Sequence, residues 1–250
     1  MSAQTGKKFE LIGSRPHYIP TKQFIIKHMK LELKPDFDEK SITCKQTLTI
    51  NIIQDKLDHI ILDAAELNIR STRVNEQSLQ FKILDDKLRI ELPTPTAEDE
   101  RITLSIDYDA KPRQGFYFVK PDNNYPNKQV QAWTQGETTQ SKYWFVCFDH
   151  PDMKFTSEII VEVPNEFVVI SNGKLVDVTR TDLVKYHWVE GHPHPAYLTS
   201  VVIGKYEEIK ENYNGIDLLY YVPEAQVDKA SLSFSNTMNM MKFFEEYIGV

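Results

Sequence analysis

The chain has 250 residues, of which 41% are hydrophobic and 26% charged, and its formal net charge at pH 7 is −7. This length and composition are those of a globular protein with one large domain or two smaller ones. Because an acidic surface repels phosphate groups, we do not expect nucleic-acid binding, and no apolar run reaches the roughly 18 to 20 residues of a membrane span.

The N-terminal residues and the two cysteines bear on the cellular compartment of the protein. The first ten residues, MSAQTGKKFE, lack the apolar stretch of a secretory signal, so we expect a cytoplasmic protein. Residues 1–20 contain glycine and proline without periodicity, which predicts a flexible tail. Cys44 and Cys147 lie far apart and predict neither a disulfide framework nor a zinc site. Cys44 falls on the apolar face of an alternating segment, which predicts a core residue.

Alternation of apolar and polar residues predicts β-strands from about residue 24 to residue 210. The alternation is clear at 42–52, where Gln46 is the polar exception on the apolar face. It predicts an all-β fold of antiparallel sheets, with almost no helix except a short turn at about 138–145. The predicted strands are 24–34, 42–52, 59–62, 67–74, 79–84, 87–92, 102–108, 116–119, 130–134, 159–163, 167–170, 175–179, 183–189 and 197–203.

Several connections carry turn signals. Asp85 and Asp86 predict a two-residue hairpin turn between two short strands. The sequence SNG at 171–173 predicts a second hairpin. Residues 121–128 have the composition of a surface loop, and GHPHP at 191–195 predicts a rigid loop before the next strand.

The pattern changes after Pro223. Apolar residues then recur every three or four positions from Val227 to Ile248, which predicts one amphipathic helix with Gly249 as its C-terminal stop. A helix at the end of a long β domain lacks a partner for its apolar face. We therefore expect self-association through residues 227–248, or disorder after about residue 223.

Few residues have the spacing of a known catalytic or metal site. The chain contains no H-E-x-x-H, P-loop, G-x-S-x-G or G-x-G-x-x-G motif. His192 and His194 are the only close pair of histidines, and their proline-rich surroundings favour a structural turn over metal binding. His150, between Asp149 and Pro151, is predicted to have a capping or surface role. We therefore expect this chain by itself to bind no zinc and no other cofactor.

Glu137 is the strongest candidate for a functional side chain. It lies one residue after Gly136 and directly beyond the strand predicted at 130–134. This position predicts a carboxylate that a loop presents at the rim of a sheet. Two interpretations are open from the residues alone. Glu137 is either a surface carboxylate near the start of a short helix, where the helix dipole favours it, or a group presented to the amine of a substrate or partner.

The stretch that begins at Gln135 resembles the N-terminal domain of the M1 zinc aminopeptidases. That family has Q-x-E, an Arg, F-P-C-F/W-D-x-P and a Lys, and this chain has QGE, Lys142, WFVCFDHP and Lys154. The resemblance continues in SNG at 171–173, AYLTSVVIGKYE at 196–207, YYVPE at 220–224 and KFFEEY at 242–247. The departures are Lys142 for Arg, Val146 for Pro and His150 for an acid, whereas the Gln and Glu of the first motif are retained.

The resemblance implies both an architecture and a role. It implies a large β saddle at 21–212, followed from 213 to 250 by the truncated start of a thermolysin-like α+β catalytic domain. It also implies that Glu137 binds the free α-amine of a peptide substrate and that Gln135 borders the first substrate pocket. The zinc ligands and the G-x-M-E-N substrate strip of the family would lie beyond residue 250. The missing catalytic domain would then be a partner of this chain, which should be inactive alone.

A second class of function is a non-catalytic protein-interaction scaffold with an M1-like saddle, as in the aminopeptidase-like subunit of a eukaryotic transcription factor. The intact QGE favours the aminopeptidase, because a scaffold has no need of an amine-binding carboxylate. An H-E-x-x-H in the downstream reading frame of the gene would decide between the two. Glu66 lies outside the motif, and we expect its substitution to be nearly neutral.

Overall fold

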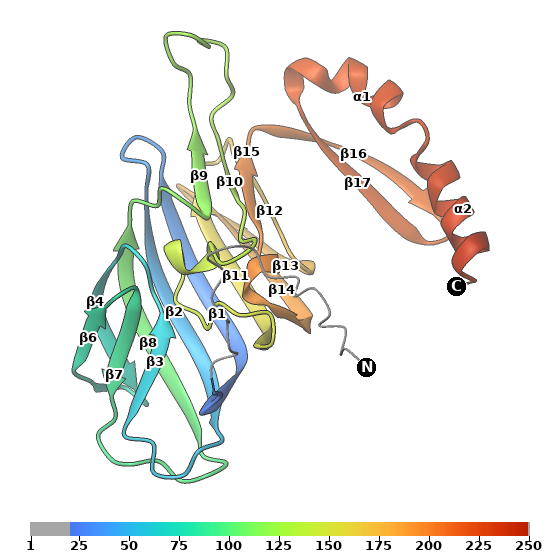
Figure 1. Ribbon diagram of the computed structural model, residues 1–250. Helices are drawn as coiled ribbons and strands as arrows, with labels where there is room; N and C mark the ends of the chain where they lie inside the picture. The colour runs from blue at the N-terminus through green and yellow to red at the C-terminus, as the bar shows by residue number, and fades with distance from the viewer. Residues whose placement is uncertain (1–20, 250) are drawn as a thin grey trace, which may run out of the picture.

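The computed structural model describes residues 21–249, and the tail predicted at 1–20 lies outside them. Within this part of the chain, seventeen strands form four sheets, and two short α-helices follow near the C-terminus (Figure 1). The prediction of an all-β fold with several antiparallel sheets is confirmed. No helix among these residues is long and apolar enough to cross a membrane.

The largest sheet has eight strands in the order β13-β14-β11-β1-β2-β8-β4-β5. One pair departs from the predicted antiparallel arrangement, because β1 and β11 run parallel, with Leu31 opposite Ile159. More than a hundred residues connect these two strands, which gives the chain the length that a parallel crossover needs. The strands are β1 (Phe24–Asp36), β2 (Ser41–Ile52), β4 (Leu67–Val74), β5 (Gln77–Ser78), β8 (Arg101–Ala110), β11 (Lys154–Val163), β13 (Lys174–Arg180) and β14 (Val184–Pro195).

Three smaller sheets complete the β structure. The four-stranded sheet has the order β12-β15-β10-β9, the three-stranded sheet β3-β7-β6, and the last sheet is the hairpin β16-β17. Their strands are β3 (His59–Asp63), β6 (Phe81–Leu84), β7 (Lys87–Glu91), β9 (Phe116–Val119), β10 (Gln131–Thr134), β12 (Val168–Ser171), β15 (Val201–Gly204), β16 (Tyr206–Tyr213) and β17 (Ile216–Pro223). The boundary predicted between 212 and 213 therefore falls inside the β16-β17 hairpin.

A single hydrophobic cluster joins the large sheet to the three- and four-stranded sheets. Alternate residues of β1, β2, β8 and β11 enter it, as the pleat of a half-buried strand requires. Cys44 is 2% exposed, so its prediction as a core residue is confirmed. Burial raises the pKa of its thiol to about 12, which leaves the group protonated and unreactive at neutral pH.

The predicted turns have different outcomes. Asp85 and Asp86 do connect β6 to β7, with φ angles of 49° and 60°, as a type I′ hairpin turn requires. The chain also turns at Gly173, where φ is 80°. The hairpin predicted there is wrong, because β12 pairs with β15 and β13 pairs with β14. Turn residues specify a local bend, whereas the partner of each strand depends on the rest of the fold.

Two segments before residue 204 also differ from prediction. Residues 191–195, predicted to be a loop, form the end of β14, where His194 lies opposite Phe155. The strand predicted at 197–203 begins instead with the 3-10 helix η2 (Ala196–Leu198) and only then enters β15. In the first case the local proline and glycine signals are overridden by pairing with a distant strand.

The single helix predicted at 227–248 is wrong. The structure has η3 (Glu224–Gln226), α1 (Val227–Phe234) and α2 (Thr237–Ile248). The break falls at Ser235 and Asn236, whose side chains compete for backbone hydrogen bonds and favour helix ends. Gly249 does end α2, because its φ is 79° and its N–H donates to Glu245 O at 3.0 Å. Both helices lie along the β16-β17 hairpin (Figure 1).

Candidate functional site

The QGE loop, residues 135–137, follows directly from the end of β10. Its backbone is held on both sides. The N–H of Gln135 donates to Gly115 O at 2.9 Å, and the N–H of Gln140 donates to Gly136 O at 2.8 Å. Just beyond, η1 (Ser141–Tyr143) is the short helix that the sequence predicted in this region. The loop is therefore a fixed turn between a strand and a helical turn.

Gly136 explains why the loop has this shape. A Cβ atom at this position would lie 2.6 Å from Tyr197 O and 2.7 Å from Ser141 Oγ. Neither distance is compatible with a side chain, so the close approach of η2 requires glycine. Gly136 is buried, whereas Gln135 and Glu137 on either side of it are exposed. The packing of one glycine thus directs both neighbouring side chains outward.

The carboxylate of Glu137 has no cationic partner among residues 21–249, because none of the ion pairs formed there includes it. Its backbone N–H donates to Gln135 Oε1 at 3.0 Å. The side chain of Gln135 therefore supports the backbone at Glu137 and keeps its amide N–H groups for other partners. An exposed carboxylate on a fixed backbone is suited to accept hydrogen bonds from an ammonium group.

The aromatic segment after η1 is attached to the large sheet by buried polar groups. Gln46, the polar exception on β2, donates from Nε2 to Val146 O at 2.6 Å and accepts from Val146 N at 3.0 Å. Tyr108 on β8 donates from its hydroxyl to Trp144 O at 3.0 Å. Sequence reasoning did not assign these roles, although the position of Gln46 among apolar residues was a visible signal. They fix the segment behind the QGE loop against the sheet.

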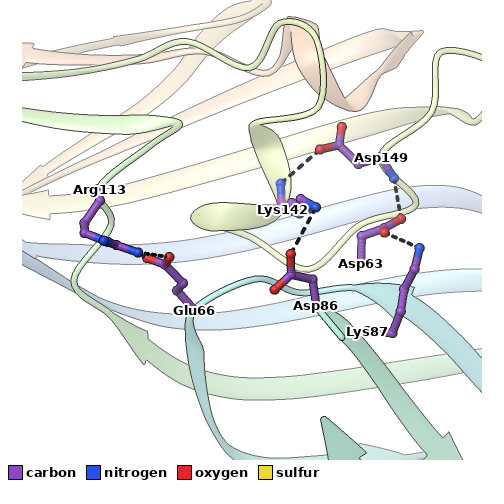
Figure 2. A network of polar contacts seen from close by, with 7 residues as sticks. All are labelled: Asp63, Glu66, Asp86, Lys87, Arg113, Lys142 and Asp149. Carbon is purple, nitrogen blue, oxygen red and sulfur yellow. Dashed lines mark hydrogen bonds and ion pairs between the residues drawn. The ribbon is translucent and has the colours of Figure 1, made fainter. Parts of the chain in front are cut away.

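A network of charged groups connects η1 to the three-stranded sheet (Figure 2). The N–H of Lys142 donates to Asp149 Oδ2 at 3.2 Å, and its Nζ lies 3.3 Å from Asp86 Oδ2. The N–H of Asp149 donates to Asp63 Oδ2 at 3.0 Å, and Asp63 also pairs with Lys87. Lys142, which replaces the usual Arg of the family motif, therefore has a structural ion pair with a residue of the β6-β7 turn.

Asp149 is the unusual member of this network. It is 8% exposed, and its Oδ1 has no hydrogen-bond partner among the described residues. Burial raises the pKa of its carboxyl group to about 6. The N–H donated by Lys142 lowers this pKa, whereas the nearby negative charge of Asp63 raises it. Sequence patterns did not predict this, because the raised pKa comes first from burial in the folded chain and then from the charge of Asp63, which is 86 residues away.

An ion pair lies between the residue before β4 and the segment that leads to Gly115. Arg113 donates from Nε to Glu66 Oε2 at 3.0 Å and from Nη2 to the other carboxylate oxygen (Figure 2). This pair connects the start of β4 to the turn that ends at Gly115, whose carbonyl accepts from Gln135. Glu66 itself forms no hydrogen bond or ion pair with residues 135–137, and its partner Arg113 is 78% exposed. The near-neutral effect expected of its substitution stays a prediction.

The histidines within residues 21–249 do not form a metal site. Within residues 21–249, no group of three or more His, Cys, Asp or Glu side chains could hold a metal ion. His194 Nε2 lies 3.0 Å from Ser157 Oγ, whereas the side chain of His192 is 99% exposed. His150 Nδ1 accepts from the N–H of Asp152 at 3.1 Å, which fits the predicted capping role. These residues do not have the arrangement that a zinc ion requires.

Comparison with known proteins decides the family. Residues 25–198 match the model of the peptidase M1 N-terminal domain. This chain belongs to the M1 peptidase family. The match covers most of the chain and confirms the resemblance seen in the QGE and WFVCFDHP motifs.

Individual relatives of this M1 domain agree with the assignment. Over 238 residues the chain is 25% identical to a leukotriene A-4 hydrolase of Xenopus laevis, which covers 91% of this chain and 39% of the relative. Over 226 residues it is 27% identical to a probable aminopeptidase 2 of Sulfurisphaera tokodaii, covering 88% of this chain and 27% of the relative. The chain thus spans well under half the length of these curated relatives.

Two solved structures share the fold of this M1 domain. A native yeast LTA4 hydrolase superposes with a TM-score of 0.76 at 19% identity, over 90% of this chain and 35% of that one. A two-domain M1 zinc metallopeptidase mutant bound to L-tryptophan superposes with a TM-score of 0.68 at 20% identity, over 84% of this chain and 52% of that one. At these identities the likeness establishes the fold.

Proposed function

We propose that this chain is the N-terminal domain of a cytoplasmic, zinc-dependent aminopeptidase and that Glu137 binds the α-ammonium group of the peptide substrate. The observation that carries the proposal is the state of Glu137. Its carboxylate is exposed and has no cationic partner in the described part of the chain, and the backbone beneath it is fixed by Gly136 and Gln135. A charged group held in this way, without a partner of its own, is suited to a ligand of opposite charge.

The two exposed side chains of the loop have complementary chemistry. The carboxylate of Glu137 accepts hydrogen bonds from an ammonium group, which selects peptides with a free N-terminus. The amide N–H groups of Gln135 are donors, because its oxygen accepts from Glu137. They are suited to the first carbonyl oxygen of the same peptide, so Gln135 borders the first substrate pocket. This chain therefore binds and orients the N-terminal residue.

In the proposed enzyme the hydrolytic step depends on residues outside this chain. In a zinc peptidase the metal activates a water molecule and polarises the peptide carbonyl group. The described residues form no such metal site, and the sequence has no H-E-x-x-H. The chain alone is accordingly proposed to be inactive, with a catalytic domain as its partner.

A protein-interaction scaffold is the second candidate. One observation favours it, namely the apolar face on α2, where Met240, Phe243, Phe244 and Tyr247 are each more than half exposed. Substitution of Glu137 by Gln separates the two functions. A scaffold would keep its interactions, whereas an aminopeptidase would lose turnover of an aminoacyl amide substrate. Unchanged turnover in the enzyme that carries this domain would contradict the proposed role of Glu137.

A further inference from the structure

The exposed face of the QGE loop continues backwards into β10. Trp133, Gln135 and Glu137 are exposed, whereas the intervening Gly136 and the preceding Ala132 are buried. Successive side chains of a strand point to opposite faces, and on β10 Ala132 is buried whereas Trp133 is exposed, as this requires. Trp133 lies four positions before Glu137 in the same segment of the chain.

Trp133 is half of a stacked aromatic pair. Its register partner on β9 is Tyr117, and the two ring centroids are 4.7 Å apart with an interplanar angle of 28°. Trp133 is 38% exposed, whereas Trp144 is 0% and Trp188 7% exposed. β9 and β10 lie side by side at one end of the four-stranded sheet (Figure 1). The pair thus presents a flat apolar surface to solvent.

The QGE loop itself fixes the orientation of this pair. The hydroxyl of Tyr117 donates to Gln140 Oε1 at 2.9 Å, and the backbone N–H of Gln140 donates to Gly136 O. One residue therefore connects the aromatic pair to the turn that presents Glu137. A stacked cross-strand pair stabilises a hairpin whether or not its outer face is exposed. Stability alone does not explain why the larger ring is left in solvent beside a polar loop.

We propose that Trp133 and Tyr117 form a subsite for an apolar or aromatic side chain within the first four residues of a peptide. This inference rests on the proposed function, because Glu137 would hold the N-terminus of the same peptide. Three residues lie between Trp133 and Glu137, so their Cα atoms lie at most about 14 Å apart. An extended peptide covers that distance with about four residues. A rigid aromatic surface beside polar groups is also typical of protein recognition sites.

The test uses tetrapeptide amides of alanine and versions with one phenylalanine at position two, three or four. Each is prepared with a free and with an acetylated N-terminus. Calorimetry gives the dissociation constants for this chain, and the indole N–H resonance of Trp133 reports contact with the ring. The variants are Trp133→Leu, the conservative Trp133→Phe, and Tyr125→Leu as a control that removes an exposed aromatic ring from a loop. Thermal melts establish that each variant is folded.

We expect at least one phenylalanine peptide to bind roughly three- to tenfold more tightly than the alanine peptide, the effect of one aromatic contact. Trp133→Leu should abolish this preference, Trp133→Phe should retain part of it, and Tyr125→Leu should keep it. Equal binding of all peptides, no binding, or an unmoved Trp133 resonance overturns the subsite. Acetylation tests Glu137 separately. A phenylalanine preference that survives acetylation without loss of affinity supports the subsite and contradicts the amine-binding role.

Discussion

The backbone N–H of Lys142 donates to the side chain of Asp149, which lies seven residues later in the chain. The carboxylate thereby caps η1 from outside the helix, and η1 begins four residues after Glu137. Asp149 is itself held by Asp63 from the three-stranded sheet. The position of the candidate amine-binding loop therefore depends on a buried carboxyl group whose charge changes near pH 6.

Substitution Asp149→Asn should change the pH dependence of stability. The folded pKa is about 6 and the ordinary value is 3.8. Between about pH 4 and pH 6 the folded state therefore binds more protons than the unfolded state, so this group's contribution to the free energy of unfolding is lost as pH rises through that window. An amide does not ionise. The variant should gain about 2 to 3 kcal/mol relative to wild type between pH 4 and pH 6.5.

Urea denaturation of both proteins at several pH values measures this difference. Asp55→Asn is the control, because Asp55 is exposed and forms no side-chain hydrogen bond or ion pair within residues 21–249. Other carboxyl groups titrate in the same range, so the comparison is between variant and wild type at each pH. Parallel stability curves for Asp149→Asn and wild type would contradict the raised pKa.

Glu137→Gln should impair turnover by the proposed aminopeptidase without affecting folding. Removing one partner of a charge-assisted contact costs about 2 to 4 kcal/mol, which corresponds to about 30- to 1000-fold in kcat/KM. Glu98→Gln is the matched control, since Glu98 is exposed and distant in sequence from the loop. The measurements are kcat/KM for an aminoacyl amide and the melting temperature, each compared between variant, control and wild type. A much lower melting temperature would mean that Glu137 is structural.

Gly136→Ala should distort the QGE loop. The new methyl group would lie 2.6 Å from the backbone oxygen of Tyr197, which cannot move independently of η2. Overpacking of this kind costs about 1 to 3 kcal/mol. Gly191→Ala is the control, because no atom lies within 4 Å of its Cβ position, and it should be nearly neutral. Denaturation midpoints of the two variants test this, and equal midpoints would count against the tight packing at Gly136.

The apolar face of α2 should promote self-association of this chain. Phe243 and Phe244 are 58% and 54% exposed, and exposed apolar patches favour association. The double variant Phe243→Ser, Phe244→Ser should sediment as a monomer at concentrations at which the unaltered chain associates. Leu84→Ser removes a 71% exposed apolar side chain from the three-stranded sheet and should leave the association unchanged. A monomeric unaltered chain would refute this prediction.

The alternation at 42–52 was enough to predict β2 and the burial of Cys44, because a pleated strand with one buried face requires period two. Asp85 and Asp86 predicted their own turn because a two-residue connection restricts φ locally. The QGE motif similarly placed Glu137 on a loop, since strand, glycine and carboxylate follow one another within a few residues.

Contacts between distant segments were decided by the tertiary structure. The parallel pairing of β1 with β11, the separation of β12 from β13 and the end of β14 at Pro195 all depend on which strands meet in space. The hydrogen bond between Asp149 and Asp63 and those between Gln46 and Val146 also depend on the tertiary structure. Periodicity and turn chemistry act over a few residues, whereas burial and electrostatics depend on groups brought together from across the chain.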